Sequence, residues 1–244
     1  MKDFVIIIPA RYDSKRFLGK PLIDILGKTM IQRVYEQCLK AVPENLIYIA
    51  TDDIRIRNIS ESFGANVLMT SKECLTGTDR VAEAASQVNA RYYINLQGDE
   101  PIFNPEDITK LISNLNSFDG EILNGYCSIK TEKQFINKSI PKVVFRPDKR
   151  LLYMSRSPIP GNKTKDFIYG HRQVCIYAFP KVALTEFTNL NYKTPLEDIE
   201  DIEILRFLEL GFEVRMIKMS DQSLAVDHIE DVEKVIKKLK DEYK

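Results

Sequence analysis

The chain has 244 residues and a formal net charge of zero, with 35 Lys and Arg residues against 35 Asp and Glu residues. This length suffices for a full-sized hydrophobic core, and the balanced charge does not support general attraction to nucleic acid or to an anionic membrane. No apolar run approaches the ~20 residues that a membrane-spanning helix needs. Its four cysteines are widely separated, with no Cys-x-x-Cys pair, and favour reduced thiols over disulfides or zinc. We therefore expect a cytoplasmic protein with no nucleic-acid or membrane partner.

The first predicted strand, residues 4–8, is followed by a loop rich in cations. The strand is apolar and β-branched and ends at Pro9, a pattern typical of a strand buried on both faces. The loop carries four cations within ten residues: Arg11, Lys15, Arg16 and Lys20. In open α/β sheets, polyanionic ligands bind in such a loop at the carboxyl end of a parallel strand. Residue types alone leave a solvated basic turn as the alternative.

Helices and strands alternate after this loop. The spacing of apolar residues predicts helices over 29–41 and 54–63, strands over 46–50, 66–69 and 92–96, and a helix opening at 76–80. Such alternation predicts a parallel, helix-covered sheet with right-handed crossovers.

Two short segments near these elements have residue types suited to ligand binding. Thr76-Gly-Thr-Asp-Arg80 opens a helix, and Gly77 permits close approach of a ligand. Gln97-Gly-Asp-Glu-Pro101 follows the strand over 92–96 with two carboxylates and an amide. Hard divalent cations are held by one or two carboxylates together with ligand phosphates. An acidic turn without a ligand is equally consistent with the second segment.

The second half of the chain is predicted to be richer in strands. We expect strands over 122–129, 141–145 with antiparallel partner 151–155, 174–179 and 212–219, and helices over 105–115, 195–206 and 230–243. A polar loop over 162–169 is a candidate cover for a site. The helix over 195–206 would carry Glu197, Glu200 and Glu203 as one stripe of carboxylates, either functional or simply solvated. We expect one α/β domain over 1–244, with a β-rich excursion at about 120–190.

Four segments in order carry a family resemblance. Ile8-Pro-Ala-Arg-Tyr-Asp-Ser-Lys-Arg-Phe-Leu-Gly-Lys-Pro-Leu22 resembles I-P-A-R-x-x-S-x-R-x-x-G-K-P-L, the opening of the 3-deoxy-manno-octulosonate (Kdo) cytidylyltransferases. The segments at 76–80, 97–101 and 155–160 resemble that family's S-G-T-x-R, Q-G-D-E-P and S-R-S/A-x-I-P. The resemblance implies a largely parallel, Rossmann-like nucleotidyltransferase sheet and a homodimer formed through the excursion. It also implies that CTP and Kdo give CMP-Kdo and diphosphate, with Mg²⁺, for lipopolysaccharide or capsule synthesis.

The resemblance also assigns residues to roles. It implies that Asp99 and Asp227 hold the metal and that Arg11 and Lys20 act with them in catalysis. The implied nucleotide-binding residues are Pro9, Ala10, Arg11, Ser14, Arg16, Lys20, Thr76, Gly77, Arg80, Gln97 and Asp99. The implied sugar-acid-binding residues are Arg156, which would lie over the acceptor carboxylate, His171, Gln173, Tyr177, Glu200, Glu203 and Ile204.

The chain departs from the family pattern in its acceptor half. Gln173 occupies the position of the family's His, with His171 two residues earlier on the same strand face, and Ile204 occupies that of a Gln. Ser223-Leu-Ala-Val-Asp227 replaces G-x-G-V-D. CTP and magnesium are therefore better supported than Kdo, and the alternative acceptors are 8-amino-Kdo and a nonulosonate. A non-catalytic nucleotide-binding module is a further alternative, against which the presence of both Asp99 and Asp227 speaks.

Overall fold

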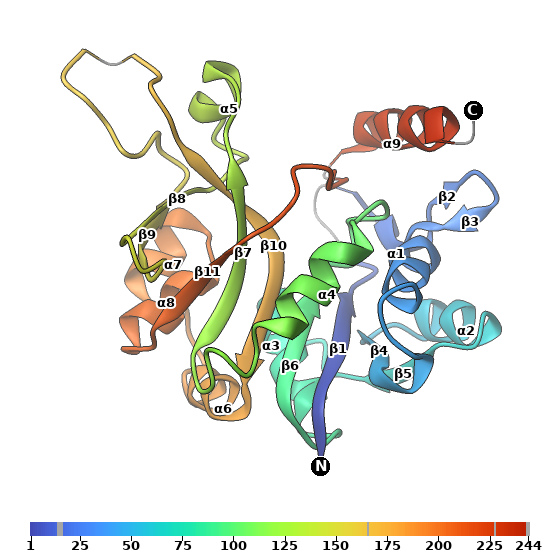
Figure 1. Ribbon diagram of the computed structural model, residues 1–244. Helices are drawn as coiled ribbons and strands as arrows, with labels where there is room; N and C mark the ends of the chain where they lie inside the picture. The colour runs from blue at the N-terminus through green and yellow to red at the C-terminus, as the bar shows by residue number, and fades with distance from the viewer. Residues whose placement is uncertain (14–16, 165, 227, 243–244) are drawn as a thin grey trace. The chain divides into compact units, whose positions relative to one another are not determined.

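The computed structural model describes residues 1–13, 17–164, 166–226 and 228–242. The chain groups into two compact units (Figure 1). Unit 1 comprises Met1–Lys110 and Gln222–Lys244, and unit 2 comprises Leu111–Asp221. The predicted excursion at about 120–190 falls within unit 2, while its role in dimerisation and the single domain over 1–244 stay predictions.

Unit 1 contains four parallel strands in the order β6-β1-β4-β5. Their bounds are Lys2–Ala10 for β1, Ile47–Thr51 for β4, Asn66–Met69 for β5 and Ala90–Leu96 for β6. The centre of β1 lies between β4 and β6, and its apolar residues from Val5 to Ile8 are fully buried. The prediction of a first strand buried on both faces is confirmed, because a central strand covered by helices has no solvent-facing side.

Polar side chains cap the first three helices of unit 1. The helices of this unit are α1 (Met30–Leu39), α2 (Ile54–Ser62), α3 (Gly77–Ala85) and α9 (Ile229–Glu242), while α4 (Pro105–Ser113) runs across the boundary into unit 2. The Asp53 carboxylate accepts a hydrogen bond from the Arg55 amide at 2.8 Å, which satisfies one of the open N–H groups at the start of α2.

A small hairpin in unit 1 was not predicted. Strands β2 (Asp24–Ile25) and β3 (Lys28–Thr29) are joined by Leu26 and Gly27, both with positive φ. Two successive positive φ values define the turn that best matches strand twist, but Leu is rare in such a position. Of the two turn residues, only Gly27 is typical of this turn, so the sequence does not predict the hairpin. Two 3₁₀ segments, η1 (Lys20–Leu22) and η2 (Glu44–Leu46), were also missed.

The C-terminal segment completes the core of unit 1. Val226 and three residues of α9 form a buried cluster with residues from the first half of the chain; its members are Ile25, Met30, Ile102, Val226, Val232, Val235 and Leu239. Phe17, Ile23 and Leu224 pack against this cluster. Burial of these apolar side chains is the main force that holds the C-terminal helix to the hairpin and to α1.

Unit 2 contains a mixed sheet. The strands are β7 (Ile122–Ser128), β8 (Lys142–Phe145), β9 (Leu151–Ser155), β10 (His171–Pro180) and β11 (Val214–Lys218). Strand β7 pairs in parallel with β11 and antiparallel with β10. Strand β8 pairs antiparallel with β10 and with β9, as predicted for the β8–β9 hairpin. The helices are α5 (Glu132–Ile136), α6 (Lys181–Asn189), α7 (Pro195–Glu200) and α8 (Ile204–Glu209), of which α5 and α6 were not predicted.

The prediction of one helix over 195–206 is wrong. Asp201 adopts φ +50°, which ends α7, and α8 begins at Ile204. The three glutamates therefore do not form a stripe on one helix. Glu197 is fully buried and pairs with Arg206, so the alternative of a solvated acidic face is also wrong for this residue.

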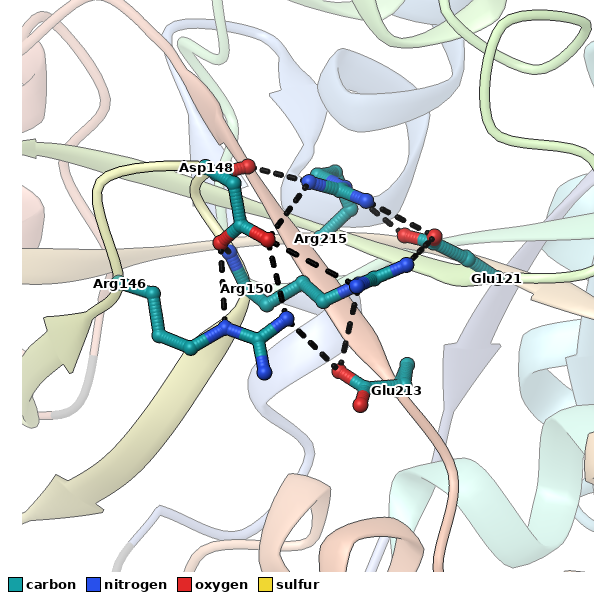
Figure 2. Close-up of polar contacts among 6 residues, drawn as sticks. All are labelled: Glu121, Arg146, Asp148, Arg150, Glu213 and Arg215. Carbon is teal, nitrogen blue, oxygen red and sulfur yellow. Dashed lines mark hydrogen bonds and ion pairs between the residues drawn. The ribbon is translucent and has the colours of Figure 1, made fainter.

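Six charged residues hold the β8–β9 turn in unit 2 (Figure 2). They are Glu121, Arg146, Asp148, Arg150, Glu213 and Arg215. Arg215 binds Glu121 through two hydrogen bonds of 2.8 Å, and Arg150 adds a third of 3.0 Å. The hydrogen bonds from Arg146 hold the pKa of Asp148 at about 2, well below its ordinary value. Arg150 donates to Glu121, and Arg215 donates to the carbonyl of Asp148, so the network ties the turn to the residue before β7 and to β11.

Among the described residues, no helix combines the length and the apolarity that crossing a bilayer requires.

Candidate functional site

In unit 1, the ends of β1 and β6 touch at backbone level. A Cβ atom at Gly98 would lie 2.7 Å from the carbonyl oxygen of Pro9, closer than real Cβ contacts come. A Cβ atom at Gly77 would lie 3.4 Å from Oε1 of Gln97 and 3.7 Å from the Pro9 ring. The structure therefore brings together three of the predicted nucleotide-binding residues, Pro9, Gly77 and Gln97, beside the carboxyl ends of two adjacent parallel strands. Ala10, the last residue of β1, is buried next to Pro9.

Thr76 and Arg80 shape the start of α3. Thr76 Oγ1 accepts a hydrogen bond from the Asp79 amide at 3.2 Å, and the Asp79 carboxylate accepts one from the Thr76 amide at 2.8 Å. This reciprocal capping box sets where the helix begins and so sets the position of Gly77. Arg80 is 3% exposed and donates to Thr70 Oγ1 at 2.5 Å, with Asp52 at 3.3 Å. Its guanidinium therefore joins α3 to the segments that follow β4 and β5.

The cationic loop is closed by a contact between Tyr12 and Gly19. The Gly19 amide donates to the Tyr12 carbonyl at 2.9 Å, and Gly19 has φ +69° with the Tyr12 ring beside it. The guanidinium of Arg55 lies 3.3 Å from the centroid of the same ring. Arg11 is exposed, and its side chain makes no hydrogen bond or ion pair with another described residue. The predicted residues Ser14 and Arg16 lie outside the described residues.

Tyr12 and Arg55 were not among the predicted site residues. The sequence offers one signal for Tyr12, because a lone aromatic residue between charged loop residues needs a packing partner. No sequence signal identifies Arg55 as that partner, since the two residues lie far apart in the chain and meet only through the fold.

Lys20 and Asp99, both predicted to be catalytic, are in direct contact. Lys20 Nζ lies 2.7 Å from Asp99 Oδ2 and 2.9 Å from the carbonyl oxygen of Val226. The Val226 amide in turn donates to the Asp99 carbonyl at 2.9 Å. The structure thus places the residue before Asp227 against Asp99. Asp227 itself lies outside the described residues.

The chemistry of the oxygen atoms at this place suits a hard divalent cation. Asp99 offers a partly exposed carboxylate, with the backbone carbonyl of Val226 beside the same lysine. Mg²⁺ prefers such oxygen ligands, and it usually takes one or two carboxylates together with phosphates of the substrate. No group of three or more His, Cys, Asp or Glu side chains suited to a metal occurs among the residues that the structure describes. A site at Asp99 therefore needs ligand oxygens or water to complete it.

In unit 2, Glu200 and Arg156 are held together at the end of β9. The Glu200 carboxylate accepts hydrogen bonds from Ser155 Oγ at 2.6 Å, the Arg156 amide at 2.8 Å and the Tyr153 hydroxyl at 3.3 Å. Burial raises the pKa of Glu200, but these hydrogen bonds outweigh it and the net pKa is lowered. The Arg156 guanidinium donates to the carbonyls of Glu200, Lys138 and Asp201 at 2.6, 3.2 and 2.8 Å.

A buried lysine, which was not predicted as a site residue, donates hydrogen bonds to the backbone beside Arg156. Lys142 is 0% exposed, and its Nζ donates to the carbonyl of Asn137 at 2.9 Å and to the carbonyl of Arg156. Burial, and then the charge of Arg156, lower its pKa to about 8. A lysine within a strand is normally expected at the surface, so the sequence around Lys142 does not predict that it is buried.

Three predicted residues lie on β10. Gln173 is 6% exposed and donates to Oδ1 of Asn124 at 3.2 Å. The ring of His171 lies between aromatic rings, 4.9 Å from Phe145 and 5.3 Å from Tyr126. Burial, followed by the charges of two lysines, lowers the pKa of His171, so the neutral imidazole is favoured. Tyr177, the third, stacks on Phe179 with ring centroids 5.6 Å apart.

The remaining two predicted residues lie at the start of α8. Glu203 is the residue before the helix, and it is partly exposed. Ile204 is 1% exposed and belongs to the core. A direct contact between Ile204 and an acceptor would therefore need the core around this side chain to open.

The parallel sheet of unit 1, with Lys20, Asp99 and Gln97 beyond its strand ends, is the architecture of an α/β nucleotidyltransferase. Residues 5–219 match the family model described as cytidylyltransferase, and the chain belongs to that family.

The relatives agree with this assignment over nearly the full chain. The 3-deoxy-manno-octulosonate cytidylyltransferase of Geobacter metallireducens is 40% identical over 96% of each chain. The protein of that name from Escherichia coli is 36% identical over 96% of this chain and 95% of its own. A solved structure of CMP:2-keto-3-deoxy-manno-octonic acid synthetase complexed with CTP superposes with a TM-score of 0.91 at 35% identity. It covers 99% of this chain and 100% of that chain. The resemblance stated from the sequence is confirmed.

Proposed function

We propose that the chain transfers CMP from CTP to Kdo and releases diphosphate, as the names of its relatives suggest. The observation that carries the proposal is the contact of Lys20 with Asp99 beside Gln97 and Gly77. A cation for the phosphates and a carboxylate for a metal thus meet at Asp99, two residues beyond Gln97, whose side chain lies beside Gly77. All of them lie where open α/β sheets bind ligands.

In this reaction an acceptor hydroxyl attacks the α-phosphorus of CTP in line, and diphosphate leaves. The protein contributes mainly by positioning and by neutralising charge, since phosphoryl-type transfer needs little covalent participation from side chains. Arg11 and Lys20 are the candidates for neutralising the phosphates, and Gln97, Gly77 and Pro9 for holding the nucleotide.

Asp99 and Asp227 are the proposed ligands of Mg²⁺. When bound, the metal would stabilise the developing charge and lower the pKa of the acceptor hydroxyl. Asp99 supplies the carboxylate. A hydrogen bond from the Val226 amide to the Asp99 carbonyl holds the backbone of this residue in place.

In unit 2, the proposed sugar-acid-binding residues are those that the resemblance implied. Arg156 supports this role because its guanidinium is oriented by three backbone carbonyls and is still partly exposed. A cation held in one orientation loses little conformational entropy when it binds a carboxylate.

A second candidate acceptor follows from Gln173. The buried amide of Gln173 contacts Asn124, and this polar pair differs from the imidazole that the family pattern has at this position. A pocket with another set of donors and acceptors discriminates against analogues that leave its polar groups unpaired. 8-Amino-Kdo or a nonulosonate is therefore the alternative acceptor.

The experiment that tests the proposal is a matrix of four nucleoside triphosphates against a panel of 2-keto sugar acids, with diphosphate release as the readout. We expect release with CTP and Kdo in the presence of Mg²⁺. Release with another triphosphate in preference to CTP would overturn the nucleotide assignment. Absence of release with every pair would favour the non-catalytic binding module. The predicted homodimer is tested on the same preparation by light scattering after size-exclusion chromatography.

A further inference from the structure

The ammonium of Lys20 lies where it competes with a metal for Asp99. It is 2.7 Å from Asp99 Oδ2, and the carbonyl of Val226 accepts a second hydrogen bond from it at 2.9 Å. The two side chains are only 15% and 28% exposed. The ion pair is therefore partly shielded from water, which strengthens it relative to a surface pair.

A divalent cation and this ammonium compete for the same carboxylate. Mg²⁺ binds oxygen at about 2.1 Å, so a metal on Oδ2 would lie within ~5 Å of Lys20 Nζ if the lysine stayed in place. Two cations at this separation in a half-buried place repel each other strongly. The metal therefore binds Asp99 more tightly once the lysine has left.

The lysine is the partner that can move. Asp99 is fixed through its backbone, because its carbonyl accepts from the Val226 amide at 2.9 Å and the preceding Gly98 is pressed against Pro9. Lys20 reaches Asp99 through a flexible side chain with several rotatable bonds. Its ammonium also suits the phosphates of a nucleotide, which would give it acceptors as good as those that it loses.

We propose that Lys20 keeps Asp99 closed to divalent metal until nucleotide phosphates take its ammonium, so that metal occupancy at Asp99 depends on bound nucleotide. The inference deepens the proposed function and rests on it. It makes nucleotide binding and metal binding at Asp99 coupled, and this coupling is reciprocal: metal at Asp99 raises nucleotide affinity by the factor by which nucleotide raises metal affinity.

The test measures Mn²⁺ binding directly, by electron paramagnetic resonance of free Mn²⁺ in the folded full-length chain. The difference between each protein and its Asp99→Asn counterpart isolates binding at Asp99 from binding to CTP itself. For the otherwise unchanged chain we expect little Asp99-dependent binding without nucleotide and clear binding with CTP. For Lys20→Met without nucleotide we expect affinity at Asp99 to rise at least tenfold, and CTP to add much less than it does in the unchanged chain.

Lys28→Met is the matched control. Lys28 also forms a 2.7 Å ion pair with a carboxylate, that of Glu36, but outside the site. We expect this variant to bind Mn²⁺ as the unchanged chain does. Lys20→Gln is the second test variant in case Lys20→Met folds poorly, because its amide can still donate to Val226 while lacking the charge.

The proposal is overturned if the unchanged chain without nucleotide binds Mn²⁺ at Asp99 as tightly as the Lys20 variants do. It is also overturned if removing the charge at Lys20 lowers thermal stability and leaves Mn²⁺ affinity unchanged, since the ion pair would then be structural only. Failure of the proposed function is a separate result: no diphosphate release from CTP, with the gain in Mn²⁺ affinity in the Lys20 variants still observed.

Discussion

The carboxylate of Glu197 and the guanidinium of Arg206 form a two-bonded ion pair that is entirely removed from solvent. The distances are 2.5 Å for Nε–Oε2 and 2.7 Å for Nη2–Oε1, and the side chains are at most 1% exposed. Arg206 also lies over the ring of Phe187, 3.7 Å from its centroid. The pair joins α7 to α8 across the break at Asp201, where a continuous helix was expected.

Removing one partner of this pair should be strongly destabilising. Glu197→Gln leaves Arg206 buried without a counter-charge, and we expect it to lower the free energy of unfolding by about 3–5 kcal/mol in urea titrations. Glu36→Gln, which breaks the exposed pair with Lys28, should stay within about 0.5 kcal/mol of the parent. Equal effects of the two substitutions would mean that the buried pair contributes no more than a surface one.

Asp99→Asn should leave the fold intact and lower turnover by ~100-fold or more, because it removes a carboxylate from the proposed metal site. The amide keeps the shape of the side chain and can no longer bind a metal strongly. Diphosphate release measures the turnover, and circular dichroism measures the fold. A turnover near that of the parent would remove Asp99 from the metal site.

Arg11→Ala and Lys20→Ala should weaken CTP-dependent turnover by raising KM for CTP, with different effects on stability. Arg11 is exposed and its side chain has no partner among the described residues, so its loss should change the free energy of unfolding by less than about 0.5 kcal/mol. Lys20 holds Asp99 and Val226, so its loss should cost somewhat more. Loss of stability with full activity in both variants would make the loop structural.

Lys142 should give the free energy of unfolding a dependence on alkaline pH. Its pKa is about 8 in the folded chain and about 10.4 in an unfolded one, so between these values the unfolded chain binds more protons. Stability relative to Lys142→Met should therefore rise with pH over that window, by up to ~3 kcal/mol, and stay constant below pH 8. Urea unfolding of both proteins from pH 7 to 10 measures this difference. A flat difference would show that the amine titrates normally.

The acceptor half offers a comparison of two substitutions. Gln173→His restores the family residue, and we expect it to raise kcat/KM for Kdo relative to 8-amino-Kdo if Gln173 sets specificity. Ile204→Gln would place an amide at a position that is 1% exposed, and we expect it to cost about 1–3 kcal/mol of stability. If Kdo is already the better acceptor and neither substitution changes the ratio, the departures from the family pattern do not determine specificity.

The sequence predicts the sheet of unit 1 well because the spacing of apolar residues and the residues that end each element agree there. The strand over 4–8 is an uninterrupted apolar run that ends at a proline, and the helix over 54–63 starts at an aspartate and stops before Gly64. The meeting of the segments that contain Pro9 and Gln97 also follows from the pairing of β1 with β6, since carboxyl ends of neighbouring parallel strands meet at one edge.

The sequence fails where tertiary contacts override local signals. The spacing of Glu197, Glu200 and Glu203 is helical, but pairing with Arg206 and with Ser155 directs the first two to different partners and the chain breaks at Asp201. Lys142 is read as a surface residue because no sequence pattern shows that the carbonyls 5 and 14 positions away accept hydrogen bonds from its ammonium. The link between Lys20 and Val226 spans 206 positions, which no local pattern can indicate.

The late arrival of Val226 and α9 in the core of unit 1 has a consequence for biosynthesis. A ribosome adding roughly 5–20 residues per second makes all of unit 2 before the residues from Gln222 onward emerge. Until then, the apolar side chains of Ile25 and Met30 have no cover from the helix that buries them in the finished protein. We therefore expect the nascent chain to expose this surface for on the order of ten seconds. During this time chaperones that bind apolar segments can recognise unit 1, while unit 2 can already fold.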